Sequence, residues 1–351
     1  MRGIVFLGER ELEIQNFPDP TPGAGEAVLE LRASGMCGSD LKFYRASNDG
    51  GTAALGLGGG GDGPVIAGHE PCGVVVALGP ETGEYGVSVG DRVMVHHYHG
   101  CGHCGHCDVG WSQLCQHGIT VYGVTGHGGH ADYIKVPAST LVALPESLSF
   151  ETGAAIACGT GTAFGALQRI NLSGRDTIAI FGQGPVGLSA TQLATAMGAR
   201  VIALDIAPER RALATDFGAE VVIDPGTDDA PAALKELTHG KGVDLALDCS
   251  GVAAGRLAAI QGTRVWGTVC FVGEGDDVTI DVSRDMLRKQ LTIVASWTFS
   301  RSGQAECARF VADRDVAVDD LFTQRYALDQ AKEAYTLFDT QTTGKGVFLA
   351  H

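Results

Sequence analysis

The segment from Thr177 to Asp205 reads TIAIFGQGPVGLSATQLATAMGARVIALD and contains the pattern that decides the fold of this chain. A short apolar run, Ile178 to Phe181, is followed by glycines at 182, 184 and 187 and then by a segment with the apolar periodicity of a helix. A second apolar run, Val201 to Leu204, ends in Asp205. This order predicts a strand, a tight glycine turn, a helix and a second strand.

The glycines of this segment have the properties that dinucleotide binding requires. Gly182 permits the turn, Gly184 lets the backbone approach a pyrophosphate, and Gly187 lets the helix pack closely on the strand. The helix that starts with Pro185 and Val186 presents its N-terminus to the phosphates. A flexible glycine loop is the alternative in a chain with 51 glycines, but it does not explain the strand and helix on either side.

Asp205 predicts which dinucleotide is bound. It lies eighteen residues after the third glycine, where a carboxylate accepts hydrogen bonds from the adenine ribose. Because a carboxylate would repel a 2′-phosphate, NAD(H) is favoured over NADP(H). A turn or helix-capping role is the weaker alternative. Arg210 either covers the adenine or is an exposed helix arginine, and both interpretations stay open.

Helices and strands alternate after Asp205. The pattern predicts helices at 208–217 and 230–238 and strands at 220–223, 243–248, 263–272 and 291–296. With the two strands of the glycine segment they make about six, which predicts an α/β fold with a doubly wound parallel sheet. Further cofactor contacts are expected at the strand ends, at Ser250, Val272 and Gly273.

Length and charge narrow the classes of protein. A chain of 351 residues predicts two domains. Lys and Arg total 25 against 41 for Asp and Glu, a formal charge of −16, and no basic run occurs, which argues against nucleic acid and anionic membranes as partners. The first residues, MRGIVFLGERELEIQ, resemble neither a signal peptide nor a membrane span. Ten cysteines without a secretory signal indicate reduced thiols or metal ligands and a cytoplasmic location.

The two ends of the chain are predicted to form one domain. Short alternating strands broken by prolines at the start are typical of a small β-barrel. Residues 46–63 are expected to form a glycine-rich surface loop. A helix at 328–338 and a strand at 347–350 suit a return to the first domain. We therefore expect one domain from 1–152 and 297–351, and a dinucleotide-binding domain from 153–296.

Four cysteines form the strongest metal signal. Cys101, Cys104, Cys107 and Cys115 are spaced so that four thiolates converge on one Zn²⁺. A closed shell of four sulfurs leaves no position for substrate, so this zinc would be structural. Free thiols and two disulfides are the weaker alternatives. Six nearby histidines are interpreted mainly as solvated loop residues, although one could compete for metal: His96, His97, His99, His103, His106 and His117.

Together these motifs resemble the zinc-containing alcohol dehydrogenases of the medium-chain dehydrogenase/reductase family. The likeness covers nearly the whole chain and includes GHE at 68–70, VSVGDRV at 87–93, the four-cysteine loop, CGTGT at 158–162 and the glycine turn. It implies a GroES-like β-barrel catalytic domain beside a Rossmann domain, and a homodimer or homotetramer. The branch with secondary-alcohol, polyol and threonine dehydrogenases is the most similar.

The resemblance also implies a catalytic zinc in addition to the structural one. Its ligands would be Cys37, His69 and Cys158, with Glu70 as a ligand that enters or leaves. Ser39 would pass on the proton of the alcohol, and Thr162 would lie beside the nicotinamide. Taken singly, each residue has a plain alternative in packing or a turn. The remaining cysteines, Cys72, Cys249, Cys270 and Cys307, are assigned to packing.

Two features depart from the family pattern. Lys42 stands where a relay histidine is usual, so the proton would leave through water, or Lys42 would instead contact the ribose or a phosphate of the cofactor. The separation of Cys37 and His69, thirty-two residues, is longer than the family pattern because of the glycine-rich insertion.

The resulting hypothesis is a zinc- and NAD-dependent dehydrogenase that interconverts an alcohol, by the resemblance a secondary alcohol or polyol, and a ketone or aldehyde. Carbonyl reduction as the physiological direction is a close alternative. A non-catalytic dinucleotide-binding zinc protein is less well supported, because binding alone does not need the set of Cys37, His69, Cys158 and Ser39. A zinc-free quinone reductase would lack Cys37, His69 and the cysteine loop.

Overall fold

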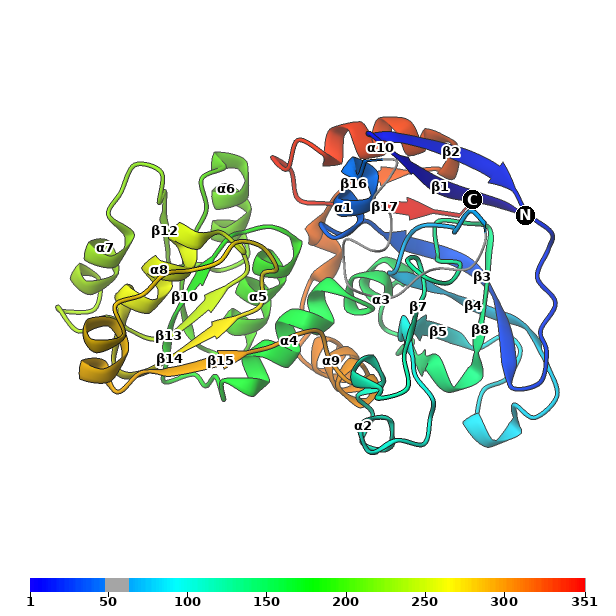
Figure 1. Ribbon diagram of the computed structural model, residues 1–351, viewed down its shortest axis with the longest axis horizontal. Helices are drawn as coiled ribbons and strands as arrows, with labels where there is room; N and C mark the ends of the chain where they lie inside the picture. The colour runs from blue at the N-terminus through cyan, green and yellow to red at the C-terminus, as the bar shows by residue number, and fades with distance from the viewer. Residues whose placement is uncertain (48–62, 351) are drawn as a thin grey trace.

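The protein, seen here as a computed structural model, consists of two domains that lie side by side (Figure 1). The structure describes residues 1–47 and 63–350, so most of the predicted glycine-rich loop at 46–63 lies outside the described residues. One domain is built on a seven-stranded mixed sheet and the other on a six-stranded parallel sheet. We call them the mixed-sheet domain and the parallel-sheet domain.

The parallel sheet confirms the predicted doubly wound α/β fold. Its strands have the order β12-β11-β10-β13-β14-β15, and every neighbouring pair is parallel. In the chain they are β10 (Thr177–Phe181), β11 (Arg200–Leu204), β12 (Val221–Ile223), β13 (Val243–Asp248), β14 (Thr263–Phe271) and β15 (Thr292–Ala295). The helices between them are α5 (Pro185–Ala196), α6 (Pro208–Asp216), α7 (Ala230–Glu236) and α8 (Ala253–Gly262).

Alternate side chains of β10 show why helices cover both faces of this sheet. Ile178 and Ile180 belong to the same core as Leu188 of α5. Ala179 and Phe181 point to the other face and share a core with Leu234 of α7. From Ile178 to Phe181 every side chain is apolar and buried, as expected for a central parallel strand.

The mixed-sheet domain contains both ends of the chain (Figure 1). Its sheet has the order β16-β17-β3-β4-β5-β9, with β8 also paired to β3. These strands are β3 (Glu26–Gly35), β4 (Pro71–Leu78), β5 (Arg92–Val95), β8 (Tyr133–Pro137), β9 (Leu141–Ala143), β16 (Phe322–Tyr326) and β17 (Lys345–Leu349). Two further pairs are β1 (Arg2–Gly8) with β2 (Glu11–Asn16), and β6 (Tyr98–His99) with β7 (Thr120–Val121). The C-terminal strand β17 pairs with β3, so the last residues of the chain complete the sheet begun by the first.

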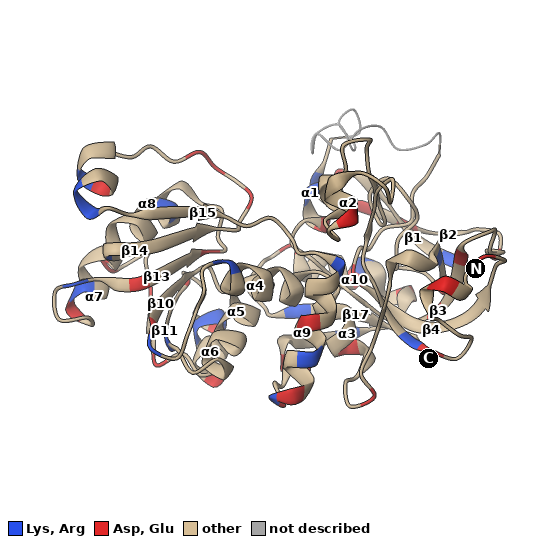
Figure 2. Cartoon of the chain, turned by 90° about the horizontal axis from the view of Figure 1, so that it is seen from below, with Lys and Arg blue, Asp and Glu red and all other residues tan. Residues whose placement is uncertain are grey.

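The remaining helices are short or lie between the domains. They are α1 (Asp40–Arg45), α2 (Gly105–Asp108), α3 (Phe150–Ile156), α4 (Gly159–Arg169), α9 (Arg301–Asp313) and α10 (Ala331–Phe338). Single 3₁₀ turns are η2 (Gly83–Tyr85), η3 (Ser112–Leu114), η4 (Ala138–Thr140), η6 (Leu287–Lys289), η7 (Val318–Leu321) and η8 (Leu328–Gln330), and η5 (Val282–Met286) is a π-helical turn. In the part of the chain that the structure describes, none of the helices has the length and apolarity needed to cross a bilayer. Acidic and basic residues are interspersed over both domains (Figure 2).

One expected helix is in fact two. The small apolar residues from Ala154 to Leu167 predict one helix that carries Cys158, whereas in the structure α3 ends at Ile156 and α4 begins at Gly159. Cys158 lies between them with φ −145° and ψ −82°, outside the helical region. The break places the Cys158 Sγ 3.9 Å from the Cys37 Sγ, a contact made possible by leaving the helix.

Candidate metal and dinucleotide sites

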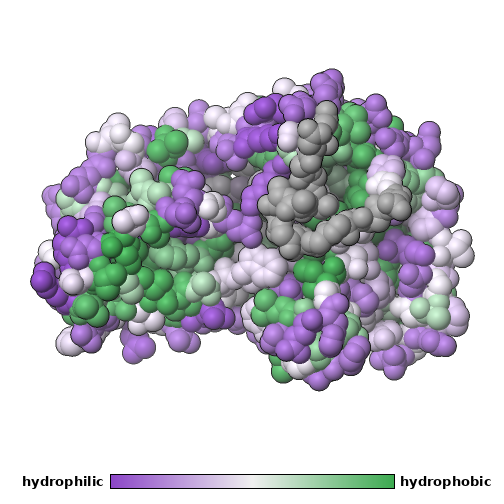
Figure 3. Space-filling model, in the orientation of Figure 1, coloured by the Kyte–Doolittle hydropathy of each residue, from purple (hydrophilic) through white to green (hydrophobic). Residues whose placement is uncertain are grey.

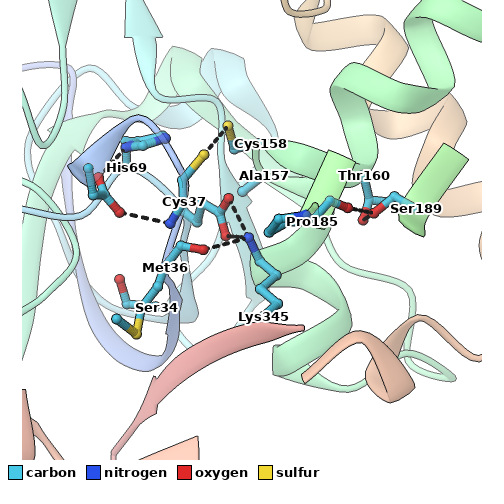
Figure 4. A network of polar contacts seen from close by, with 12 residues as sticks. Ser34, Met36, Cys37, His69, Ala157, Cys158, Thr160, Pro185, Ser189 and Lys345 are labelled. Atoms are coloured by element: carbon cyan, nitrogen blue, oxygen red, sulfur yellow. Dashed lines mark hydrogen bonds and ion pairs between the residues drawn. The ribbon is translucent and has the colours of Figure 1, made fainter. Parts of the chain in front are cut away.

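Four predicted metal ligands converge where the two domains meet. One donor atom from each of Cys37, His69, Glu70 and Cys158 lies within 4.8 Å of the others. Cys37 follows β3, His69 and Glu70 precede β4, and Cys158 stands between α3 and α4. Figure 4 shows Cys37, His69 and Cys158 close together. Two sulfurs, an imidazole and a carboxylate are donors that suit Zn²⁺, so the residues fit the metal that the sequence predicts.

Electrostatics at this cluster favour a bound cation. A hydrogen bond from Cys158, opposed by burial, holds the pKa of the Cys37 thiol well below its usual value. The pKa of Cys158 is raised for the same reason, since the two sulfurs share one proton. Burial raises the pKa of Glu70 to about 8. A divalent cation among these groups would replace the shared proton and neutralise the carboxylate.

Ser39 lies beside the same ligands. Its Oγ is 3.3 Å from the Cys37 Sγ and 3.2 Å from the His69 Nε2. The hydroxyl is therefore in contact with two of the four donor residues, where it can exchange a proton with a molecule held at the cluster.

Lys345 is a residue of the site that sequence analysis missed. Its buried ammonium lies 2.7 Å from the Glu70 Oε1 and 2.9 Å from the carbonyl oxygen of Met36. Figure 4 shows the side chain reaching from β17 towards Cys37. Lys345 is 275 residues from Glu70 in the chain, so only the pairing of β17 with β3 brings them together.

A buried chain of polar groups also orients His69. Its Nδ1 lies 2.9 Å from the Asp40 Oδ1, and the other oxygen of Asp40 accepts a hydrogen bond from the Tyr335 hydroxyl. That hydroxyl is 2.7 Å from His130 Nε2, and the Ser34 hydroxyl is 2.7 Å from His130 Nδ1. A carboxylate behind a histidine fixes its tautomer and directs Nε2 to the metal. Lone polar residues in apolar segments were the only sequence signal for this arrangement.

The glycine turn after β10 has the geometry that the sequence predicts. Gly182 has φ +84°, and a Cβ on Gly187 would lie 1.8 Å from the Gly182 carbonyl oxygen. A Cβ on Gly184 would meet only the Arg210 guanidinium, at 3.9 Å, so the N-terminus of α5 is open at Gly184. Pro185 and Val186 form the first turn of that helix. This opening is suited to a phosphate group.

Other predicted cofactor contacts gather at the carboxyl edge of the same sheet. A Cβ on Gly182 would be 2.9 Å from the Ser250 backbone, and one on Gly273 would be 2.4 Å from the Gly251 nitrogen. Val272 N and Gly273 N both donate to the Asp248 carbonyl oxygen. This edge is where ligands of doubly wound sheets bind.

Asp205 directly follows β11 and is buried. It accepts hydrogen bonds from Gln183 N and Ala207 N, which hold the carboxylate beside the glycine turn. Arg210 is half-buried and donates to the Thr343 carbonyl oxygen. The interpretation of Arg210 as an exposed helix arginine is therefore wrong, because the side chain lies against the C-terminal segment.

Helix α4 connects the metal cluster to the dinucleotide site. The helix begins directly after Cys158, and Thr162 N donates to the Cys158 carbonyl oxygen one turn later. Thr160 on the same helix bonds to Ser189 of α5 at 2.9 Å (Figure 4). Thr162 is thus one turn after Cys158 on the helix that contacts α5.

An ion pair and an aromatic wall bridge the domains beside the metal cluster. Lys42 of α1 lies 2.6 Å from Glu274, which follows β14, and Trp297 donates to the same carboxylate. The Trp297 ring is 5.8 Å from that of Tyr98, which packs on His97 at 4.1 Å. The centres of the His97 and His69 rings are 5.1 Å apart. The rings of Trp297, Tyr98 and His97, which we call the aromatic wall, thus connect the Lys42–Glu274 ion pair to the predicted metal ligand His69.

Two of the six histidines near the cysteine loop correct the sequence interpretation. His96 and His97 were expected to be solvated loop residues, but each is only 1% exposed. They directly follow β5, and the chain continues from that strand into the interior between the domains, where aromatic rings cover both.

The four cysteines of the loop form a second group of possible metal ligands. The sulfurs of Cys101, Cys104, Cys107 and Cys115 lie within 4.8 Å of one another. Hydrogen bonds from the backbone of Gln116 and Cys107 lower the pKa of Cys104 to about 5. Cys101 N and His117 N donate to the Cys115 Sγ at 3.2 and 3.4 Å. Donors directed at sulfur stabilise thiolates, the form that binds zinc.

Comparison with known proteins finds a matching family for each of the two domains. Residues 23–146 match the family model of the alcohol dehydrogenase GroES-like domain, and residues 185–313 match that of the zinc-binding dehydrogenases. An uncharacterized zinc-type alcohol dehydrogenase-like protein of Escherichia coli K12 is 39% identical over 99% of this chain and 98% of its own length. The sorbitol dehydrogenase of Bacillus subtilis is 30% identical over 95% of this chain and 92% of its own length. The solved 2R,3R-butanediol dehydrogenase of Bacillus subtilis superposes with a TM-score of 0.87 at 27% identity, covering 100% of this chain and 99% of that one.

Proposed function

Because this chain belongs to the zinc-containing alcohol dehydrogenases of the medium-chain dehydrogenase/reductase family, we propose that it oxidises a secondary alcohol or polyol with NAD⁺. The family establishes a zinc oxidoreductase that acts on alcohols. The observation that carries the finer proposal is the convergence of Cys37, His69, Glu70 and Cys158 beside Ser39, with α4 leading to the glycine turn.

Each group at the site has a role in this reaction. Cys37, His69 and Cys158 would hold the catalytic zinc, and Glu70 would enter or leave the shell. Zinc bound there supplies a Lewis acid for the alcohol oxygen, and the dinucleotide supplies the hydride acceptor. Ser39 takes the alcohol proton and passes it to water. Asp40 holds the His69 ring in place, and Lys345 holds Glu70.

A panel of substrates tests the reaction. Formation of NADH is followed with secondary alcohols, diols, polyols and primary alcohols, and the reverse reaction with the corresponding carbonyls. Cys37→Ala is expected to lose activity and catalytic zinc. The matched control Cys307→Ala, at a buried cysteine of α9, is expected to retain both. Tight NADH binding without turnover in either direction would instead favour the non-catalytic alternative.

The choice of a secondary alcohol or polyol is supported by two relatives. Their names specify sorbitol and 2R,3R-butanediol, which both carry secondary hydroxyl groups. In this chain the wall beside the metal cluster offers both aromatic rings and the charges of Lys42 and Glu274. Primary alcohols that outcompete diols in kcat/KM would overturn this assignment.

NAD⁺ is preferred because Asp205 is held at the end of β11. A 2′-phosphate there would face a buried carboxylate. We expect kcat/KM to be much higher with NAD⁺ than with NADP⁺. The ratio of kcat/KM with NAD⁺ to kcat/KM with NADP⁺ should be smaller in Asp205→Ser. It should be unchanged in Asp216→Ser, at the end of α6.

We also propose that the chain assembles as a homodimer or homotetramer through the parallel-sheet domain. β15 is the end strand of its sheet, and Thr292 and Ala295 of this strand are exposed. Apolar side chains gather on this domain in Figure 3, and the exposed ones around the edge are Val265, Trp266, Val282 and Leu287. Light scattering during gel filtration should give a multiple of 36.4 kDa, and Trp266→Glu should lower it. A monomeric mass would refute the assembly.

The predicted division and location of the chain are part of the proposal. Pairing of β17 with β3 supports a catalytic domain made of residues 1–152 and 297–351, with residues 153–296 as the dinucleotide-binding domain. The ten free cysteines support the reducing cytoplasm as its location. One catalytic and one structural zinc ion are expected in each chain, and elemental analysis measures their number.

A further inference from the structure

A third group of possible metal donors shares one atom with the four-cysteine loop. The Cys101 sulfur and one ring nitrogen each from His103 and His117 lie within 4.8 Å of one another. The two imidazole rings are nearly parallel, at 19°, with their centres 5.7 Å apart. Both histidines are exposed and Cys101 is half-buried, so this group faces solvent.

The hydrogen bond of His103 determines which of its ring nitrogens can bind metal. His103 Nδ1 lies 2.7 Å from the carbonyl oxygen of Cys101, an atom that can only accept. Nδ1 therefore carries the hydrogen, and in the neutral ring the lone pair is on Nε2. Histidines at metal sites commonly donate a hydrogen bond from one ring nitrogen to a backbone carbonyl and bind the metal through the other nitrogen.

We propose that Cys101, His103 and His117 form an additional zinc site, which loads the four-cysteine centre. Imidazole nitrogen and thiolate sulfur are both zinc ligands. A thiolate bound to one zinc ion keeps further lone pairs, so the Cys101 sulfur can bridge to a second ion. Water completes the exposed shell.

The shared sulfur provides a route for the ion. Cys104 is only 6% exposed, whereas both histidines are accessible to solvent. An ion bound to the histidines already has one of the four sulfurs as a ligand, and the other three lie within 4.8 Å of that sulfur. The ion moves inward as bonds to the two imidazoles break and bonds to three thiolates form. Each cysteine that is still protonated releases its proton to water.

Zinc counting tests the site itself. The double variant His103→Asn/His117→Asn is compared with the unmodified chain and with His106→Asn, a loop histidine outside the group, after equilibrium dialysis against buffered zinc. We expect the unmodified chain and His106→Asn to bind one ion more than the double variant. Equal counts in all three proteins would overturn the proposal.

The comparison remains valid if the proposed function fails. Loss of either other zinc site would lower the count of all three proteins equally, whereas the additional site is read from the difference between them. That difference does not depend on turnover.

Isotope exchange tests the loading role. Holoprotein is incubated with isotopically enriched zinc, and incorporation is followed by mass spectrometry. We expect one phase of exchange to be several-fold slower in the double variant than in His106→Asn. An unchanged rate would overturn the loading role.

Discussion

The Lys42 ammonium lies 2.6 Å from the Glu274 carboxylate and joins α1 of the mixed-sheet domain to the loop after β14 of the parallel-sheet domain. Trp297 donates to the other oxygen of the same carboxylate at 2.9 Å. Since Lys42 lies one helical turn after Ser39, and Glu274 follows Gly273, the bridge is close to the metal cluster and to the strand end where cofactor contacts are expected.

Breaking this bridge should change cofactor release more than stability. Both side chains are partly exposed, so Lys42→Met should cost less than about 1 kcal/mol of unfolding free energy. Because the contact joins the domains, we expect faster NADH dissociation, measured by stopped-flow fluorescence. Lys332→Met removes an exposed pair with Glu11 inside one domain and serves as the control. Unchanged NADH release with slower hydride transfer would mean that Lys42 acts in proton transfer instead.

Alanine at two glycines of the turn should separate folding from cofactor binding. In Gly187→Ala the new Cβ would overlap the Gly182 carbonyl, at 1.8 Å, so we expect a loss of about 1–3 kcal/mol in stability. Gly184 has φ −70° and open space at its Cβ, so Gly184→Ala should fold normally. The added methyl group would occupy the approach to the pyrophosphate and weaken NADH binding. Thermal unfolding and NADH titration distinguish the two, and normal NADH affinity in Gly184→Ala would contradict the assignment.

Removal of Lys345 should leave a buried carboxylate without its partner. Lys345 and Glu70 are both at most 1% exposed, and burial raises the pKa of Glu70 to about 8, so Lys345→Met is expected to cost about 3–5 kcal/mol in denaturant unfolding above that pH, where Glu70 is ionised. The double variant Lys345→Met/Glu70→Gln should recover much of that loss, because the unpaired charge is gone. If the double variant were no more stable than Lys345→Met, the loss would come from packing rather than charge.

His96 should make the protein sensitive to mild acid. Burial lowers its pKa to about 4, and neither ring nitrogen has a hydrogen-bond partner among the described residues. Between this pKa and the ordinary value of about 6.5 the unfolded chain takes up a proton that the folded chain does not. Stability therefore falls as pH falls through this range, by up to about 1.4 kcal/mol per pH unit.

Substitution of His96 tests this effect. His96→Leu should reduce the difference in unfolding free energy between neutral and mildly acidic buffer, whereas His106→Leu, at an exposed histidine, should not. Burial also lowers the pKa of His130 to about 4. Because His130 is present in both variants, part of the dependence of the unfolding free energy on pH should remain. An undiminished difference in His96→Leu would show that His96 does not titrate in this way.

Local patterns in the sequence were sufficient for the scaffold and for most of the candidate site. The glycine turn, each strand and helix after Asp205, and the four-cysteine loop are formed by residues close together in the sequence. Their local geometry therefore follows from the sequence of each segment. The resemblance to a family supplied Cys37, His69, Glu70 and Cys158, which the fold brings within 4.8 Å. Their roles as ligands stay predictions.

Only the tertiary structure decided which buried polar groups are paired. Lys345 meets Glu70 because β17 pairs with β3, and Asp40 meets His69 because β3 pairs with β4. Tyr335 reaches Asp40 from α10, 295 residues later in the chain. The break at Cys158 and the burial of His96 and His97 are likewise visible only in the tertiary structure. Sequence alone determines the covalent spacing of residues and their preference for water or core, whereas charge compensation depends on which distant strands and helices pack together.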